Sequence, residues 1–325
     1  MTSQLLYEKY RKSLEQKFQK LFESYLPHTL YDPSAYIMKS GGKRLRPILV
    51  MLSAGAAGGN VNKVKNAAVA VELFHNFTLV HDDIMDNADK RRNNQTVHKK
   101  YDSNTAILTG DNLIAHAYNY LLKDCSDNNK KVINIFSQGI VEVCEGQSYD
   151  EAFETSANVS IDDYLKMIKK KTAALLEVCC SIGARLGGAD PKTIRALENY
   201  GLNTGIAFQL RDDMLDIFGS EDKFGKMIGG DLIQGKKTFL FLKAMQNAKG
   251  DDKNLLKSFI RNHGIKRKDV SKFKKLYEKL GVLDDTEKEI LYFNRRAIKS
   301  LNSIKDSNYK ETLIWLVNDL SGRKN

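Results

Sequence analysis

The stretch ELFHNFTLVHDDIMD at residues 72–86 decides the fold. Apolar residues stand nearly all round a helix drawn over residues 64–86, which predicts a buried helix that ends in the aspartates of DDIMD. The pattern Asp-Asp-x-x-Asp returns in FQLRDDMLD at residues 208–216, again after an apolar segment. Two matched acidic clusters at the ends of apolar segments indicate one shared purpose.

The spacing of the aspartates indicates a metal site. Asp82 and Asp86 lie four residues apart, so one helix face carries both carboxylates, and Asp212 and Asp216 repeat this geometry. Like charges at this spacing destabilise an isolated helix, and Mg²⁺ is commonly held by carboxylates and substrate phosphates. One cluster alone would fit a solvated acidic helix end, but the matched pair favours the metal. Neither cluster has the glycine and distal glutamate of an EF-hand loop.

Residues suited to binding phosphate surround the clusters. His75 lies two turns before Asp82 within about 20° on the same helix face, where a core histidine is the plainer alternative. Gln209 precedes Asp212 by three residues. The other candidates are Lys43, Arg46, Arg91, Arg92, Lys171, Thr172, Lys226 and Lys236. Because arginine pairs with phosphate at two points and lysine acts as a point charge, the set indicates a metal-bridged diphosphate with a hydrocarbon tail in the apolar interior.

The rest of the chain predicts a single all-α domain spanning residues 1–325. It has only four prolines, and its apolar residues keep a helical period. Loops are expected at 27–33, between Pro27 and Pro33, and at 87–104. Helices are expected at 5–26, 48–57, 64–86, 105–123, 130–150, 161–186, 191–217, 237–247, 253–262, 270–280, 284–301 and 309–320. No alternating strand series or internal repeat is visible, so helices wrapped around a core helix are expected.

Composition and charge exclude several classes of protein. Hydrophobic residues make up 42% and charged residues 28%, which excludes a disordered chain. The net charge is +11, and after residue 250 the chain has 18 basic and 11 acidic residues. Such an excess attracts nucleic acid, anionic membrane or phosphorylated substrate, or simply solvates a surface. The four cysteines form no Cys-x-x-Cys pair, so reduced, buried cysteines in a cytoplasmic protein are expected, and no signal peptide or transmembrane stretch is visible.

The sequence resembles a trans-prenyl diphosphate synthase of the short-chain, geranylgeranyl or farnesyl type. The resemblance runs from about Tyr36 to Leu242. It rests on GGKRLRP at 41–47, ELFHNFTLVHDDIMD at 72–86, RR at 91–92, TVH at 96–98, GD at 110–111, KT at 171–172, FQLRDDMLD at 208–216 and GKMIGGDLIQGKKT at 225–238. It implies an all-α isoprenoid synthase bundle around a deep central cavity, a cytoplasmic homodimer, and no nucleic-acid partner.

The same resemblance implies roles for the candidate residues. Three Mg²⁺ ions would join an allylic diphosphate to the metal ligands Asp82, Asp83, Asp86, Asp212, Asp213 and Asp216. The allylic diphosphate would be held by Arg91, Lys171, Thr172, Gln209, Lys226 and Lys236. The diphosphate of isopentenyl diphosphate would be held by Lys43, Arg46, His75 and Arg92, and whether Arg323 and Lys324 close over it is left open. The expected catalytic residues are Asp82, Asp86, Arg91, Lys171, Asp212 and Lys236.

The implied reaction is a head-to-tail 1′–4 condensation by ionisation, condensation and elimination. Mg²⁺ and lysine neutralise the leaving diphosphate, so the allylic C–O bond ionises to a cation. The isopentenyl double bond attacks that cation, and the released diphosphate is a plausible base for the proton that is lost. No nucleophilic serine or cysteine is needed. An apolar cavity excludes water from the cation.

Three other functions compete with this hypothesis. A terpene cyclase usually has one Asp-rich motif and a different second motif, whereas this chain has two Asp-Asp-x-x-Asp clusters and GGKRLRP. A non-catalytic partner subunit of a longer-chain heteromeric synthase typically loses aspartates, and all six are present here. A basic helical protein that binds nucleic acid would show salt-sensitive DNA binding without release of diphosphate.

In the family that the sequence resembles, product length depends on bulk below the first aspartate cluster. Thr78 lies one turn below Asp82 and leaves that level open, while Phe77 and Phe74 lie roughly 7.5 and 12 Å below it. An enzyme with one aromatic residue at this depth resembles those that stop at C20, and Phe74 leaves C15 as the alternative.

Two departures from the family concern loops: Asn93 follows the arginine pair where glycine is usual, and no proline follows Thr238.

Overall fold

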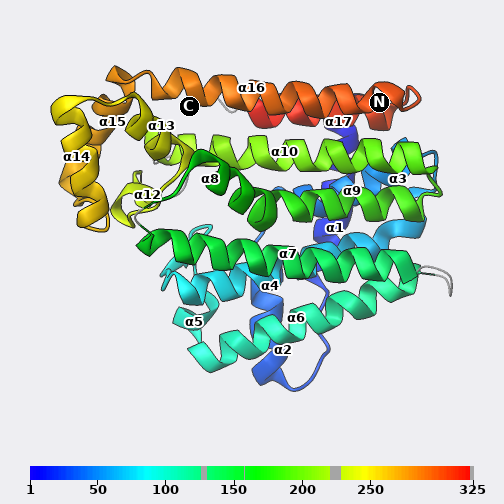
Figure 1. Cartoon of the computed structure of the whole chain (residues 1–325). Coiled ribbons are helices and arrows are strands. Elements are labelled where there is room, and N and C mark those ends of the chain that lie inside the picture. The colour runs from blue at the N-terminus through cyan, green and yellow to red at the C-terminus, as the bar shows by residue number, and fades with distance from the viewer. Residues whose placement is uncertain (126–129, 157, 220–227, 323–325) are drawn as a thin grey trace. The chain divides into compact units, whose positions relative to one another are not determined.

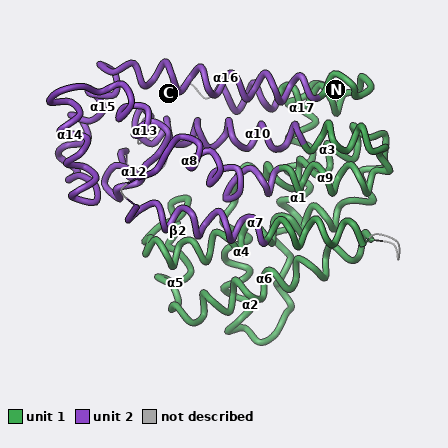
Figure 2. Tube along the Cα trace, viewed as in Figure 1, with its two compact units in different colours: residues 1–140, 177–198, 301–315 green, residues 141–176, 199–300, 316–325 purple. Residues whose placement is uncertain are grey.

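The computed structural model describes residues 1–125, 130–156, 158–219 and 228–322 (Figure 1). Most of these residues are helical, which confirms the all-α prediction. Within the described ranges the strands form one antiparallel pair, β1 (Lys90–Arg91) with β2 (Asn94–Gln95). None of the helices in these ranges is both long and apolar enough to cross a membrane. The chain divides into two compact units (Figure 2), and the single domain stays a prediction.

Unit 1 comprises residues 1–140, 177–198 and 301–315. Its elements are α1 (Ser3–Gln19), α2 (His28–Lys39), α3 (Leu45–Ala56), η1 (Val61–Val64), α4 (Lys65–Met85), β1, β2, α5 (Val97–Lys100), α6 (Ser103–Asp124) and η4 (Leu301–Ser303). The predicted core helix is confirmed as α4, which packs against α3 and α6. Every residue from Ala67 to Asn76 is buried, as the apolar pattern predicts for a helix surrounded by others.

Unit 2 comprises residues 141–176, 199–300 and 316–325. Its elements are α8 (Ile161–Ile168), the π-helical turn η2 (Lys169–Ala173), α12 (Gly230–Ile233), α13 (Phe239–Asn247), α14 (Gly250–Arg261), η3 (Arg267–Asp269), α15 (Val270–Lys279) and α16 (Val282–Ser300). The core contains a group of aromatic side chains in which the rings of Phe241 and Phe259 stack with 4.4 Å between their centroids. Residues of both units occur in α7 (Lys130–Thr155), α9 (Ala174–Leu186), α10 (Pro191–Phe218) and α17 (Asn308–Ser321).

The loop expected between Pro27 and Pro33 is wrong, because α2 occupies residues 28–39. Pro27 precedes the helix, and its carbonyl accepts the first intrahelical N–H bonds. Pro33 lies inside α2 and costs it one backbone hydrogen bond. It is nevertheless buried with Ile37 and Met38 on one stripe, and that burial offsets the lost bond. Conversely, the helix expected over residues 5–26 ends at Gln19.

The cysteine expectation holds only in part. Cys179 and Cys180 are buried and free, and burial raises the pKa of the Cys180 thiol to about 12. Cys144 is exposed, so the expectation of burial is wrong there. The difference has a simple cause, since Cys144 stands on an outward position of α7 that helical periodicity alone does not distinguish.

Candidate active site

Both aspartate clusters lie at the carboxyl end of a helix. Asp82 and Asp83 are in the last turn of α4, Asp86 caps that helix, and Asp212 and Asp216 are in the last two turns of α10. A helix carries partial negative charge at this end, so carboxylates there are unfavourable unless a cation compensates them. Oxygen-only clusters in this position fit a hard divalent ion. Within the described ranges, no three His, Cys, Asp or Glu side chains form a ready-made metal cluster.

Arg91 and Asp83 form an ion pair in unit 1. The Nε of Arg91 lies 2.9 Å from each carboxylate oxygen of Asp83, and its terminal NH2 nitrogen lies 2.7 Å from Oδ1. Asp83 is only 1% exposed. The sequence predicted Asp83 as a metal ligand and Arg91 as a phosphate ligand, whereas the structure joins the two side chains to each other.

The arginine pair lies on the β1–β2 hairpin, whose turn residues are Arg92 and Asn93. Both have positive φ, 52° and 65°, a conformation that asparagine tolerates and that two-residue hairpin turns require. Asn93 therefore replaces the usual glycine without opening the turn. The Arg92 guanidinium donates to the carbonyl of Gly41, and a Cβ on Gly42 would lie 2.8 Å from its NH1 nitrogen. Glycine at position 42 lets Arg92 approach the backbone.

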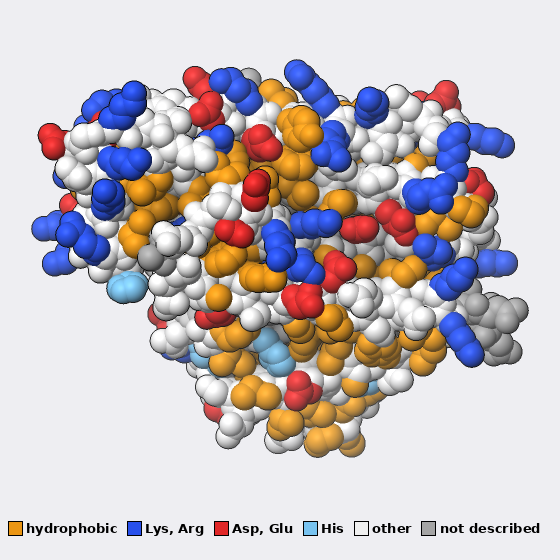
Figure 3. Space-filling model, in the orientation of Figure 1, with side chains coloured by type: hydrophobic (Ala, Val, Ile, Leu, Met, Phe, Trp, Pro, Cys, Tyr) orange, Lys and Arg blue, Asp and Glu red, His pale blue; other side chains and the backbone are white. Residues whose placement is uncertain are grey.

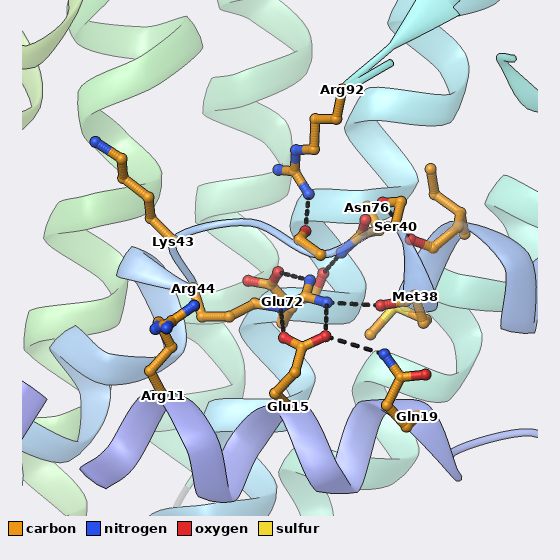
Figure 4. A network of polar contacts seen from close by, with 12 residues as sticks. Arg11, Glu15, Gln19, Met38, Ser40, Lys43, Arg44, Glu72, Asn76 and Arg92 are labelled. Atoms are coloured by element: carbon orange, nitrogen blue, oxygen red, sulfur yellow. Dashed lines mark hydrogen bonds and ion pairs between the residues drawn. The ribbon is translucent and has the colours of Figure 1, made fainter. Parts of the chain in front are cut away.

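Arg44 anchors the turn that contains Gly41 and Gly42, a role that no sequence motif predicted (Figure 4). Its side chain is fully buried; NH1 donates to Glu72 at 2.7 Å, Nε to Glu15 at 2.8 Å, and NH2 to the carbonyl of Met38 at 2.7 Å. Burial alone would raise the pKa of Glu15, but Arg44 makes the net shift downward. Arg44 has φ of 53° directly before α3, and its anchored side chain holds the backbone between Lys43 and Arg46.

Arg46 and His75 lie together in unit 1. NH1 of Arg46 is 3.0 Å from Nε2 of His75, which is 8% exposed. Burial lowers the pKa of His75 well below its usual value, and the charges of Arg46, Arg92 and Arg91 lower it further. A neutral ring can accept the Arg46 N–H bond, and the tautomer that does so has its proton on Nδ1. With Arg44, four arginines lower the pKa of this one buried histidine, so the site is strongly electropositive and suits an anion.

Lys171 and Thr172 lie in the π-helical turn η2 of unit 2. This turn is in close contact with α7 and α10. A Cβ on Gly146 of α7 would lie 2.2 Å from the backbone nitrogen of Lys171, and one on Gly205 of α10 would lie 2.5 Å from the Cα of Ala173. The Nζ of Lys171 pairs with Asp150 of α7 at 2.5 Å. A π turn adds one residue to a helical turn and is frequent at functional sites.

A hydrogen-bonded chain connects the π turn to the second aspartate cluster. Thr172 Oγ1 donates to Gln209 Oε1 at 2.8 Å, and Gln209 Nε2 donates to Asp213 Oδ1 at 2.8 Å. The hydroxyl of Tyr164 donates to the other oxygen of Asp213. Burial, followed by the charge of Asp231, raises the pKa of Asp213 well above its usual value, although both donors act against this shift. The middle aspartate of this cluster is therefore also held by protein groups, as Asp83 is.

A small cavity of about 100 Å³ in unit 2 brings several candidates together. Residues lining it include Asp150, Tyr164, Lys171, Thr172, Gln209, Asp213, Asp231 and Lys236. Asp231 also donates its backbone N–H to Asp216 Oδ2 at 3.1 Å. No sequence motif predicted Asp150, Tyr164 or Asp231 as site residues. Of these three, only Asp231 had a signal in the sequence, since it follows the glycine pair at 229–230.

Some of the remaining candidate residues lie within the part of the chain that the structure describes. Phe74 is fully buried and packs edge-on against Phe136, with 5.4 Å between the ring centroids. Phe77 is half-buried, and its ring centroid lies 4.8 Å from that of His81. The Thr78 hydroxyl donates to the carbonyl of His75 at 2.8 Å. Lys226, Arg323 and Lys324 lie outside the described residues.

Comparisons with known proteins agree on one family. The polyprenyl synthetase family model matches residues 27–280. A geranylgeranyl pyrophosphate synthase of Geoglobus acetivorans is 38% identical over 96% of both chains, and a short chain isoprenyl diphosphate synthase of Methanothermobacter thermautotrophicus is 34% identical over 95% of this chain and 94% of its own. The crystal structure of a polyprenyl synthase from Caulobacter crescentus, complexed with calcium and isoprenyl diphosphate, superposes with a TM-score of 0.92 at 27% identity and covers 100% of this chain and 98% of that one.

Proposed function

Because the chain belongs to the polyprenyl synthetase family and is a short-chain trans-prenyl diphosphate synthase, we propose that it adds isopentenyl diphosphate to an allylic diphosphate and stops at geranylgeranyl diphosphate. The observation that carries the proposal is the pair of aspartate clusters, each at the carboxyl end of a helix and each accompanied by cationic side chains. The curated relatives that are named as geranylgeranyl synthases support the C20 product.

The proposed roles follow from charge and position. Lys171 and Lys236, which line one cavity with Thr172 and Gln209, neutralise the diphosphate that leaves the allylic substrate. Arg46, with neutral His75 as its partner, binds the diphosphate of isopentenyl diphosphate together with Lys43 and Arg92. Arg91 and Lys226 complete the allylic set. The apolar helices exclude water from the allylic cation, and the released diphosphate takes the proton.

The family uses divalent metal ions, and we infer that this chain uses three Mg²⁺. The outer aspartates of the two clusters, Asp82, Asp86, Asp212 and Asp216, are the proposed main ligands because their positions at helix ends favour a cation. Asp83 and Asp213 complete the six and also orient the clusters through their protein partners. When bound, the metal helps the allylic C–O bond to ionise by withdrawing charge from the diphosphate oxygens.

We also propose a homodimer, with α6 as its contact surface. Leu108 and Leu122 are 59% and 49% exposed and lie within about 40° of each other on α6. Exposed leucines aligned over a long helix are typical of a covered surface. Light scattering after gel filtration should give twice the chain mass, and Leu108→Glu with Leu122→Glu should give the monomer mass. The cytoplasmic location stays a prediction.

The function is tested by product analysis with labelled isopentenyl diphosphate and each of three primers, dimethylallyl, geranyl and farnesyl diphosphate. Mg²⁺-dependent release of diphosphate with C20 product is expected. A dominant C15 product would make the chain a farnesyl diphosphate synthase. Release without isopentenyl diphosphate, together with a cyclic hydrocarbon, would indicate a terpene cyclase. Lack of Mg²⁺-dependent turnover with every primer would exclude the proposal, and recovery on adding a second chain would indicate a partner subunit.

A further inference from the structure

Positive charge that the proposed reaction does not use is concentrated in one part of unit 2. Residues 249–279, here named the basic segment, contain eleven lysines and arginines and four acidic residues, a net +7 out of +11 for the chain. The segment comprises α14 and α15 with the turn between them. Figure 3 shows Lys and Arg side chains gathered over these two helices.

The basic residues of α14 form a stripe. Lys253, Lys257 and Arg261 follow at every fourth position, so their side chains point from one face of the helix, and Lys249 caps its start. Like charges at this spacing destabilise a helix. The helix still forms because Leu256 and Phe259 are buried in the core of unit 2. A stripe maintained against its own repulsion suggests a purpose outside the fold.

α15 repeats the arrangement. Three lysines of α15, Lys272, Lys275 and Lys279, and Lys268 in η3 just before it are all exposed and follow at spacings of four, three and four. Its apolar residues, Phe273 and Leu276 among them, are buried. Both helices therefore turn apolar side chains into unit 2 and basic side chains into solvent.

Much of this charge is not neutralised inside the protein. Lys279 pairs with Asp252 at 2.7 Å. Among the residues that the structure describes, no ion pair or hydrogen bond involves the side chains of Lys257, Arg261, Lys268 or Lys272. These side chains are exposed and available to an external anion.

We propose that the basic segment docks the enzyme on an anionic membrane surface. Nine of its eleven basic residues are lysines, which act as point charges toward a diffuse layer of headgroups, whereas bidentate docking favours arginine. Its aromatic residues, Phe259, Phe273 and Tyr277, are buried, so none is available for nucleic-acid bases to stack on. The choice of lipid rests on the proposed function, because a product with a long hydrocarbon tail and a diphosphate head belongs at a membrane surface.

The test is vesicle sedimentation of the whole protein without substrate. Vesicles of phosphatidylcholine with an equal part of phosphatidylglycerol are expected to bind the protein, and vesicles of phosphatidylcholine alone are not. Binding should weaken as salt rises. Replacing Lys257, Lys268 and Lys272 by glutamate should lower the partition coefficient by at least about 100-fold, since each lysine near the surface contributes about fivefold. The three corresponding glutamine replacements should give an intermediate loss.

The matched control is the triple variant Lys9→Glu, Lys12→Glu and Lys20→Glu, which makes the same change of charge at exposed lysines in and just beyond α1. It should bind anionic vesicles nearly as well as the original protein. Equal loss in both triple variants would overturn the proposal by reducing it to net charge. Equal binding to both kinds of vesicle, or stronger binding to duplex DNA than to anionic vesicles, would also overturn it. Turnover measured in solution should be unchanged in all variants, so a failure of docking is distinguishable from a failure of the proposed function.

Discussion

Asp83 and Arg91 satisfy each other, with Nε of the arginine equidistant at 2.9 Å from both carboxylate oxygens. Asp83, the middle aspartate of the first cluster, therefore has a protein cation as its partner. Asp83→Asn leaves the half-buried guanidinium without its counter-charge, so the free energy of unfolding should fall by about 1–3 kcal/mol. Asp83→Asn should also raise KM for the allylic substrate, and it should raise the Mg²⁺ concentration for half-maximal rate less than the loss of an outer aspartate does.

The matched comparison for Asp83→Asn is Asp82→Asn, which removes a proposed metal ligand. Here kcat should fall on the order of 10²–10³-fold, with a higher Mg²⁺ requirement and little loss of stability. Urea unfolding and Mg²⁺ titration of the rate check both variants. If Asp83→Asn raised the Mg²⁺ requirement as much as Asp82→Asn, the division of roles would be wrong.

Tyr164→Phe tests the second cluster. The variant removes a donor from the buried Asp213 carboxylate, so we expect a loss of about 1–3 kcal/mol in unfolding free energy and a lower kcat. Tyr277 offers a control, since it is equally buried in unit 2 and its hydroxyl has no hydrogen-bond partner among the described residues. Tyr277→Phe should be neutral or slightly stabilising. Similar losses in the two variants would mean that packing, not the Asp213 contact, causes the effect.

His75 predicts a specific dependence of stability on pH. Its pKa is lowered in the folded chain, so below the unfolded value near 6.5 only the unfolded state takes up the proton. Stability should therefore be fully present above about pH 6.5 and fall by about 1.4 kcal/mol per pH unit below it, until the folded pKa is reached. His75→Gln should remove the contribution of His75 and leave a shallower slope, because burial also lowers the pKa of His116. His28→Gln, at an exposed position, should retain the full slope, and an unchanged slope in His75→Gln would contradict the assignment.

Product length can be shifted in both directions. Thr78→Phe places an aromatic pair below Asp82 and should shorten the main product from C20 to C15. Phe77→Ala should lengthen it beyond C20, because Phe77 is half-buried and its loss opens space. Phe74→Ala should instead lower stability by about 3–5 kcal/mol, since Phe74 is fully buried against Phe136. Chromatography of labelled products decides, and an unchanged length in Phe77→Ala would contradict the role of Phe77.

The sequence was sufficient for the fold class and for placing both aspartate clusters at helix ends, because helical periodicity and charged motifs are local signals. It was not sufficient for α2, where one interior proline suggested a loop although burial of Pro33 and Ile37 favours a helix. The side-chain partners of the site residues were the least predictable feature. Asp150 reaches Lys171, and Tyr164 reaches Asp213, from positions 21 and 49 residues away, and no motif marks either contact.

The π turn at Lys169–Ala173 makes this part of the site sensitive to chain length rather than to side-chain chemistry. Deleting a single residue there would leave an ordinary α-helical turn, which local propensity tolerates well. The helices on either side would keep their rotation about the axis, because a π turn holds its extra residue within a single turn. Only residues inside the turn would shift, so Lys171 and Thr172 would change position relative to Asp150 and Gln209 while Tyr164 kept its contact with Asp213. A deletion within residues 169–173 should therefore lower activity far more than a substitution of the exposed Lys169, while the contact of Tyr164 with Asp213 remains.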